Sequence, residues 1–190
     1  MIPGWNISGV LPPIRPNKPG HDNDRSPYSV KLHQVVDRFA VSRERIEILQ
    51  GLLNYRNALH DAGIVDGFQW LDGSFMEQVE LLESRPPNDV DVVTFFRLPD
   101  GISQKSLSEQ HSSLFLPNHT KEQYKVDAYP CILGAPTEGR HVKQIAYWYS
   151  MWSHRRNGIW KGFLQVNLDP QEDVEARAAL ELILLEGGLL

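Results

Sequence analysis

The chain has 190 residues and a mass of 21.7 kDa, which suffices for one ordinary domain but not for two well-cored ones. Its 41% hydrophobic and 23% charged residues exclude a disordered or membrane-embedded protein. The net charge of −5 is unevenly distributed, because residues 140–161 carry five basic and no acidic side chains. We therefore expect a local site for an anionic ligand on an otherwise acidic protein.

The sequence predicts a cytoplasmic protein with no membrane partner. No apolar run reaches the roughly 18 residues that span a bilayer, and residues 1–19 lack the zones of a signal peptide. The single cysteine, Cys131, can form neither an internal disulfide nor a cysteine-based metal site, and we expect it in the core. The sequence leaves the oligomeric state open.

Residues 1–27 are predicted to form a proline-rich arm, and residues 28–190 a single domain. Six of the 13 prolines lie in the arm, which excludes a helix there. The arm also holds apolar side chains that we expect to pack on the domain: Trp5, Ile7, Val10, Leu11 and Ile14.

Helical and strand patterns interleave along the domain. Apolar residues recur at three- and four-residue intervals after a predicted N-cap at Ser42, and Gly63 ends this helix. Further helices are predicted over 75–82, 141–154 and 170–185, with one helical turn around 106–114 inside a polar loop, 97–123. Strands are predicted over 68–71, 90–96, 124–129 and 159–168. The order predicts an α/β or α+β fold in which helices flank a mixed β-sheet.

Three aspartates lie on the predicted strands at positions suited to a metal site. Asp89 and Asp91 lie two residues apart at the start of the 90–96 strand, so their side chains point to the same face. Two neighbouring carboxylates on a buried strand repel each other and lose hydration, which folding alone does not favour. Mg²⁺ resolves this conflict because it prefers carboxylate and phosphate oxygens. Asp127, on another predicted strand, supplies a third carboxylate.

Gly73 and Ser74 lie where the 68–71 strand ends and the 75–82 helix begins. Glycine permits close approach of the backbone, and the first N–H groups of a helix attract an anion such as a triphosphate. The Ser74 hydroxyl adds a donor. We therefore predict a nucleotide-binding turn here.

These motifs resemble those of the nucleotidyltransferase superfamily, which includes DNA polymerase beta and small minimal nucleotidyltransferases of bacteria. The resemblance covers about residues 68–129, with 14 residues between Ser74 and Asp89, slightly more than is usual. It implies that Gly73 and Ser74 bind the triphosphate, and that Asp89 and Asp91 bind Mg²⁺ or Mn²⁺. Asp127 would complete the site as third ligand or as the base for the attacking hydroxyl.

The basic segment supplies the remaining predicted nucleotide-binding residues, Arg155, Arg156 and Lys161, which flank a turn at residues 157–158. Aromatic side chains interleave with these charges, as in sites that stack bases and pair phosphates. Tyr149 and Trp152 also fit a core helix face, and both interpretations stand.

Other polar residues near these motifs are interpreted as structural or exposed. Asp72 is expected to be a turn residue, Glu77 and Glu80 to face solvent, and Arg85 to be exposed. The seven histidines show no metal-ligand spacing, which disfavours a metal-dependent phosphodiesterase.

The sequence thus predicts a Mg²⁺-dependent nucleotidyltransferase that moves a nucleotidyl group from an NTP to a hydroxyl of a protein, an RNA or a small molecule. The alternative is a non-catalytic binding module of the same fold, such as an antitoxin-like or defence-system subunit.

Overall fold

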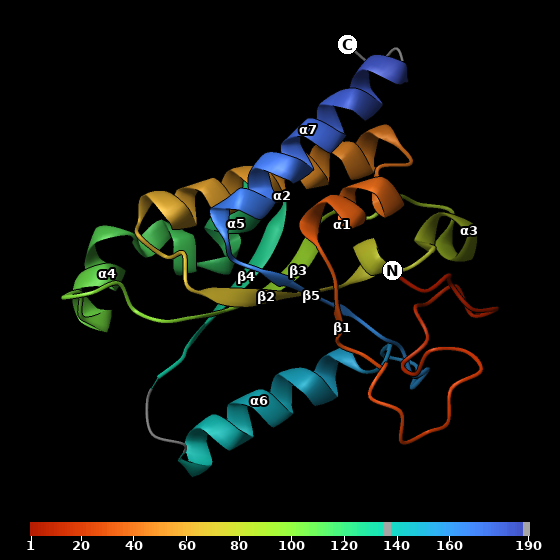
Figure 1. The fold of residues 1–190 in the computed structure, drawn as a ribbon, viewed down its shortest axis with the longest axis horizontal. Helices are drawn as coiled ribbons and strands as arrows, with labels where there is room; N and C mark the ends of the chain where they lie inside the picture. The colour runs from red at the N-terminus through yellow and green to blue at the C-terminus, as the bar shows by residue number, and fades with distance from the viewer. Residues whose placement is uncertain (135–137, 188–190) are drawn as a thin grey trace.

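The fold is a five-stranded mixed sheet with helices on both faces (Figure 1). This computed structural model describes residues 1–134 and 138–187; residues 135–137 and 188–190 of the predicted domain lie outside the described part. In the order β1-β5-β2-β3-β4, β1 is parallel to β5 and β3 to β4, whereas β2 is antiparallel to both β3 and β5. The strands are β1 (Tyr28–Ser29), β2 (Gly67–Asp72), β3 (Val90–Phe96), β4 (Val126–Ile132) and β5 (Leu164–Asn167).

Two layers of helices enclose the sheet. One face packs against α1, α2, α5 and α7, and the other against α6 (Figure 1). The helices are α1 (Leu32–Phe39), α2 (Arg43–Asp61), α3 (Val79–Glu83), α4 (Gln104–Gln110), α5 (Pro117–Tyr124), α6 (Gly139–Trp152) and α7 (Pro170–Glu186), with short 3₁₀ turns η1 (Ser74–Met76) and η2 (Ser112–Phe115). The predicted α+β class is confirmed. In both described ranges, every helix is too short or too polar to span a bilayer.

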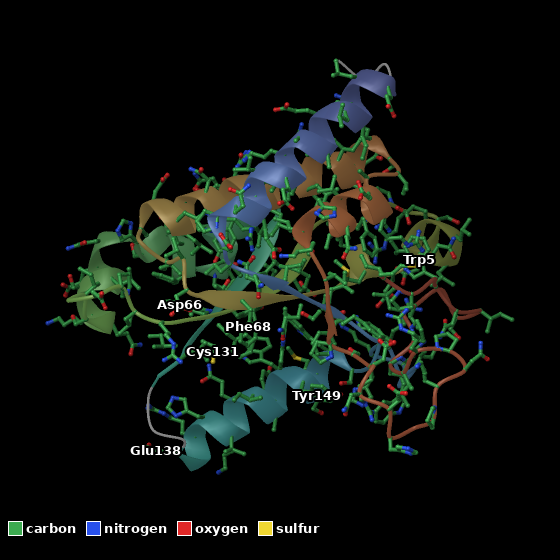
Figure 2. All side chains as sticks on the ribbon, viewed as in Figure 1. Trp5, Asp66, Phe68, Cys131, Glu138 and Tyr149 are labelled. Atoms are coloured by element: carbon green, nitrogen blue, oxygen red, sulfur yellow. The ribbon has the colours of Figure 1, made fainter. Side chains whose placement is uncertain are left out.

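The two faces of β3 enter different cores, as strand alternation requires. Val90 and Val92 are fully buried in the larger core with α1, α2 and α7. Val93 and Phe95 enter a smaller, aromatic core with Trp148 of α6. Phe68, Cys131 and Tyr149 lie between the sheet and α6 (Figure 2), and the predicted burial of Cys131 is confirmed.

Several predicted elements agree closely with the structure. The strand over residues 90–96 is confirmed, and so are the helices that begin near Ser42, near 141 and at Pro170. The Ser42 hydroxyl accepts the backbone N–H of Arg45, as an N-cap does. Gly63 follows α2 with a φ of +81°, the left-handed conformation that glycine adopts at low cost.

Other boundaries differ for local reasons. The single helix predicted over 75–82 is two pieces, η1 and α3. The strand predicted over 159–168 forms only over 164–167, because residues 154–160 instead close a turn through the bridge between His154 and Trp160. The strand predicted over 124–129 begins later, because left-handed Lys125 ends α5. Helix α1 was not predicted, nor was α5 within the supposed loop.

The arm of residues 1–27 packs on the domain through part of its apolar set. Val10 and Leu11 are buried, and the Leu11 carbonyl accepts the N–H of Gly162. Trp5, labelled in Figure 2, donates its indole N–H to the Met76 carbonyl in η1, at 2.8 Å. The expectation that Ile7 packs on the domain is wrong, since its side chain is fully exposed.

Candidate functional site

A row of three carboxylates crosses one edge of the sheet. In the strand register Asp91 of β3 pairs with Asp72 of β2 on one side and with Asp127 of β4 on the other. Residues in register project from the same face of a sheet, so all three side chains lie on the α6 face. Asp89 precedes Asp91 by two residues and adds a fourth carboxylate to this group.

A cavity of about 710 Å³ opens over this row. It brings together every site residue predicted from the sequence: Gly73, Ser74, Asp89, Asp91, Asp127, Arg155, Arg156 and Lys161. Its wall also contains polar residues that were not predicted as site residues, among them Asp72, Glu77, Arg85, Asn88, Lys121 and His154. Acidic and basic groups therefore meet in one hollow.

The turn at Gly73 is built for close contact with Asp91. Gly73 has a φ of +83°, and a Cβ added there would lie 2.6 Å from Oδ2 of Asp91. Only glycine leaves room for that carboxylate. The helix that follows is the three-residue η1, too short for the helix dipole expected from the sequence. The groups left at this turn to bind an anion are the Ser74 hydroxyl and the backbone, which an anion can approach closely.

A buried arginine supports this turn from behind. Arg45 of α2 is fully buried and donates to the carbonyls of Phe75, at 2.6 Å, and Glu77, at 2.7 Å. It also binds the carboxylate of Glu80, which was expected to face solvent and is partly exposed, with a side chain 35% accessible. These bonds hold η1 against α2 and fix the position of Ser74.

Lys121 of α5 lies between two of the predicted metal ligands. Its ammonium is 2.7 Å from Oδ2 of Asp127 and 3.4 Å from Oδ2 of Asp89. The hydrogen bond to Asp127 raises the pKa of Lys121, so the ammonium stays charged. Oδ1 of Asp127 is buried and has no hydrogen-bond partner among the described residues. Lys121 thus neutralises this carboxylate without satisfying it.

Two carboxylates of the row, Asp91 at its centre and Asp72 at one end, are held in an unfavourable environment. Burial, with the charges of Asp89 and Asp127, raises the pKa of Asp91 to about 6. Burial raises the pKa of Asp72 to about 7, although Lys161 lowers it. Oδ1 of Asp72 is also buried and unpartnered in the described part of the chain. Folding therefore concentrates negative charge here at a cost.

Lys161 and Glu77 lie deeper than the sequence suggested. Glu77 was expected to face solvent but is buried, because Lys161 lies 3.0 Å from its Oε1 and Arg155 2.9 Å from its Oε2. Lys161 also contacts Oδ2 of Asp72 at 2.9 Å. Burial opposes the charged form of Lys161, yet Asp72 and Glu77 together raise its pKa. Asp72, expected as a turn residue, is thus part of a buried ion network.

The three predicted basic residues therefore differ in availability. Lys161 and Arg155 are paired with carboxylates, Arg155 also with Glu83 at 2.5 Å. Arg156 is exposed at the cavity rim and has no ion pair among the described residues. Arg85 is exposed, as expected, and binds Glu83. Trp152 is buried in the aromatic core, whereas Tyr149 is partly exposed.

The donor set suits a divalent cation in its chemistry. Carboxylate oxygens are the ligands of Mg²⁺ and Mn²⁺, and Asp89, Asp91 and Asp127 would hold such an ion. The unpartnered, buried Oδ1 of Asp127 also fits this interpretation. Across residues 1–134 and 138–187, however, no three or more His, Cys, Asp or Glu side chains are grouped to hold a metal ion. Lys121 lies in their midst, so a cation could bind only if Lys121 moved.

Comparison with known proteins identifies the family of the chain. Neither curated proteins nor solved structures gave a match. One family model matches residues 3–167, from the arm through β5, and so includes every residue that lines the cavity. The chain therefore belongs to the family described as a family of unknown function (DUF6932).

Proposed function

We propose that the protein is a Mg²⁺-dependent nucleotidyltransferase that uses an NTP as donor and a hydroxyl group as acceptor. The observation that carries the proposal is the meeting of Asp89, Asp91 and Asp127 beside the Gly73–Ser74 turn in one cavity. These residues come from three separate segments of the chain: the turn after β2, the start of β3 and the start of β4. Their concentration costs folding energy, which supports a role in binding rather than in stability.

Within this proposal each group of residues has a separate task. Ser74 donates its hydroxyl to a phosphate oxygen, and Arg156, which is free of ion pairs in the described structure, binds the same triphosphate from the rim. Asp89, Asp91 and Asp127 hold the divalent cation. That ion, when bound, neutralises the charge that develops on the transferred phosphoryl oxygens.

The chemistry requires a proton acceptor for the attacking hydroxyl. The acceptor oxygen forms a bond to the α-phosphorus while the bond from that phosphorus to the bridging oxygen breaks, and pyrophosphate leaves. Where Asp127 acts as base rather than as third ligand, it accepts the hydroxyl proton on Oδ1, which is not engaged by another described group. Positioning and charge neutralisation supply most of the catalysis in such reactions.

One observation favours the alternative, a non-catalytic binding module of the same fold. Lys121 already pairs with Asp89 and Asp127, and Lys161 with Asp72, so the acidic row is partly neutralised without a metal ion. A module that only binds a partner would keep these ion pairs permanently. Such a module would transfer no group and would therefore have no acceptor, whether protein, RNA or small molecule.

Transfer of label separates the two functions. The protein is incubated with each α-³²P-labelled NTP, Mg²⁺ or Mn²⁺, and a cell extract as the source of acceptors. We expect label in an acceptor, and its loss by at least about 100-fold in Asp89→Asn and Asp91→Asn, since both change metal ligands. Asp37→Asn, an exposed aspartate of α1, is the matched control and should transfer normally. Absence of transfer together with absence of metal-dependent NTP binding by calorimetry would refute the proposal.

A further inference from the structure

Lys121 differs from the other cations of the cavity in what holds it. Lys161 is 6% exposed and lies between Asp72 and Glu77, and Arg155 is 18% exposed and pairs with two glutamates. The Lys121 side chain is 42% exposed. In the described part of the chain, its ion pairs are with Asp89 and Asp127 alone. Lys161 and Arg155 are therefore fixed parts of the wall, whereas Lys121 is held only by the carboxylates that a metal ion would use.

The pairing of Lys121 is also incomplete from the side of the carboxylates. Asp127 is 8% exposed, and its Oδ1 has no partner although Oδ2 contacts the ammonium. An ammonium is a single positive charge with three donors, and here it contacts the carboxylates of Asp89 and Asp127 at once, so it offsets only one of two negative charges.

The lysine side chain can leave without a change in the fold. Four methylene groups separate its ammonium from the backbone, and a partly exposed ion pair stabilises a protein only weakly. Lys121 and the predicted phosphate-binding residues Ser74 and Arg156 line the same cavity. A rotamer change in Lys121 would therefore keep its ammonium within the cavity while α5 stays in place.

We propose that Lys121 is a displaceable cation: it occupies the metal site of the empty protein and binds the phosphates of the nucleotide once a divalent cation lies between Asp89 and Asp127. This inference rests on the proposed function. Lys121 then takes two successive positions in the cavity. In the first its ammonium neutralises the carboxylates, and in the second it neutralises the nucleotide phosphates. Without nucleotide, Lys121 competes with divalent cations and lowers their affinity for the carboxylates. Lys121 becomes available for phosphate only when metal and nucleotide bind together.

Two binding measurements on Lys121→Met test the inference without any catalysis. Mn²⁺ alone is titrated by electron paramagnetic resonance, and inorganic tripolyphosphate, which every NTP contains, is titrated by calorimetry with Mg²⁺ present. We expect Mn²⁺ to bind about fivefold more tightly, because its competitor is gone. Tripolyphosphate should bind about tenfold more weakly, because a charged donor is lost. A lysine that only stabilised the fold would not change the two affinities in opposite directions.

Lys125→Met is the matched control, since Lys125 has a similar exposure, 48%, and pairs with Glu47 instead. It should bind both probes within about twofold of the wild type, as surface substitutions usually do. If Lys121→Met leaves either affinity unchanged, or shifts both in the same direction, while the wild type binds both probes, this inference is overturned and the proposed function stands. If the wild type binds neither probe at millimolar concentration, both are overturned.

Discussion

Asp91→Asn should make the metal-free protein more stable while it removes one of the proposed metal ligands. Asp91 lies in register between Asp72 and Asp127, and burial and its acidic neighbours raise its pKa from 3.8 to about 6. The folded protein thus holds this proton up to about pH 6, whereas the unfolded chain releases it near pH 4. Stability is therefore present below pH 4 and is lost as the pH rises to 6. At about 1.4 kcal/mol per pKa unit the loss amounts to about 3 kcal/mol.

The assay is urea unfolding of both proteins between pH 4.5 and 8, with EDTA to remove divalent cations. Above pH 6 the neutral amide avoids the penalty, so the free energy of unfolding should exceed that of the wild type by up to about 3 kcal/mol. The gain should shrink toward pH 4.5. Asp72, whose pKa is raised to about 7, titrates in both proteins and leaves the sign of the difference unchanged. Asp37→Asn, at an exposed position, should show no such gain.

Mg²⁺ adds a second readout, because a ligand that binds only the folded state raises its stability. Wild-type protein should gain stability in Mg²⁺, and Asp91→Asn should gain none. If Asp91→Asn is less stable than the wild type at pH 8, or gains equally at every pH, the assignment of charge repulsion at this row is wrong.

Two further substitutions test the turn beside the row. Gly73→Ala should cost about 2–3 kcal/mol of stability and abolish label transfer, because its Cβ would meet Asp91. Gly158→Ala is the control, because Gly158 has a similar φ of +82° but open space around the added Cβ. It should cost about 1 kcal/mol and keep label transfer. Equal effects of the two substitutions would exclude the contact between the Cβ and Asp91 as the cause. Arg45→Met leaves two buried carbonyls without their donor and should cost about 3–5 kcal/mol in urea unfolding. Arg43→Met, on the same helix with an 81% exposed side chain, should change stability by less than about 0.5 kcal/mol, and a similar loss in both would contradict the role of Arg45.

Elements whose stabilising contacts are local were predictable from the sequence. The Val and Phe residues of 90–96 favour a buried strand, and Ser42 marks the start of α2 by its own cap. Helix α1 has the spacing of an amphipathic helix in Leu32, Val35, Val36 and Phe39, so a signal for it was present and was missed. Helix α5 buries only Thr120 and has no apolar period, so nothing in its sequence predicts it.

The candidate site was predicted where strand alternation applies and was missed where distant segments meet. Alternation placed Asp89 and Asp91 on one face, and the register of β3 with β4 adds Asp127 to it. The burial of Glu77 depends on Lys161, 84 residues later in the chain, and no local pattern reports such a pair. Lys121 was missed because its helix, α5, was not predicted, and only the folded chain brings this lysine to Asp89 and Asp127.

Helix α2 carries two fully buried arginines, which hold β2 and the turn beside the cavity against this helix. Near the start of α2, Arg45 donates to the backbone of η1. Eleven residues later, Arg56 donates to Gln69 of β2 at 2.7 Å. Arg56 also binds the Asn167 carbonyl at the end of β5 and the carboxylate of Asp173 in α7. Strand β2 and the turn that follows it are thereby tied to α2 at both ends. We therefore expect changes of shape in the cavity to come from partly exposed side chains such as Lys121 and Arg156 rather than from β2 or η1.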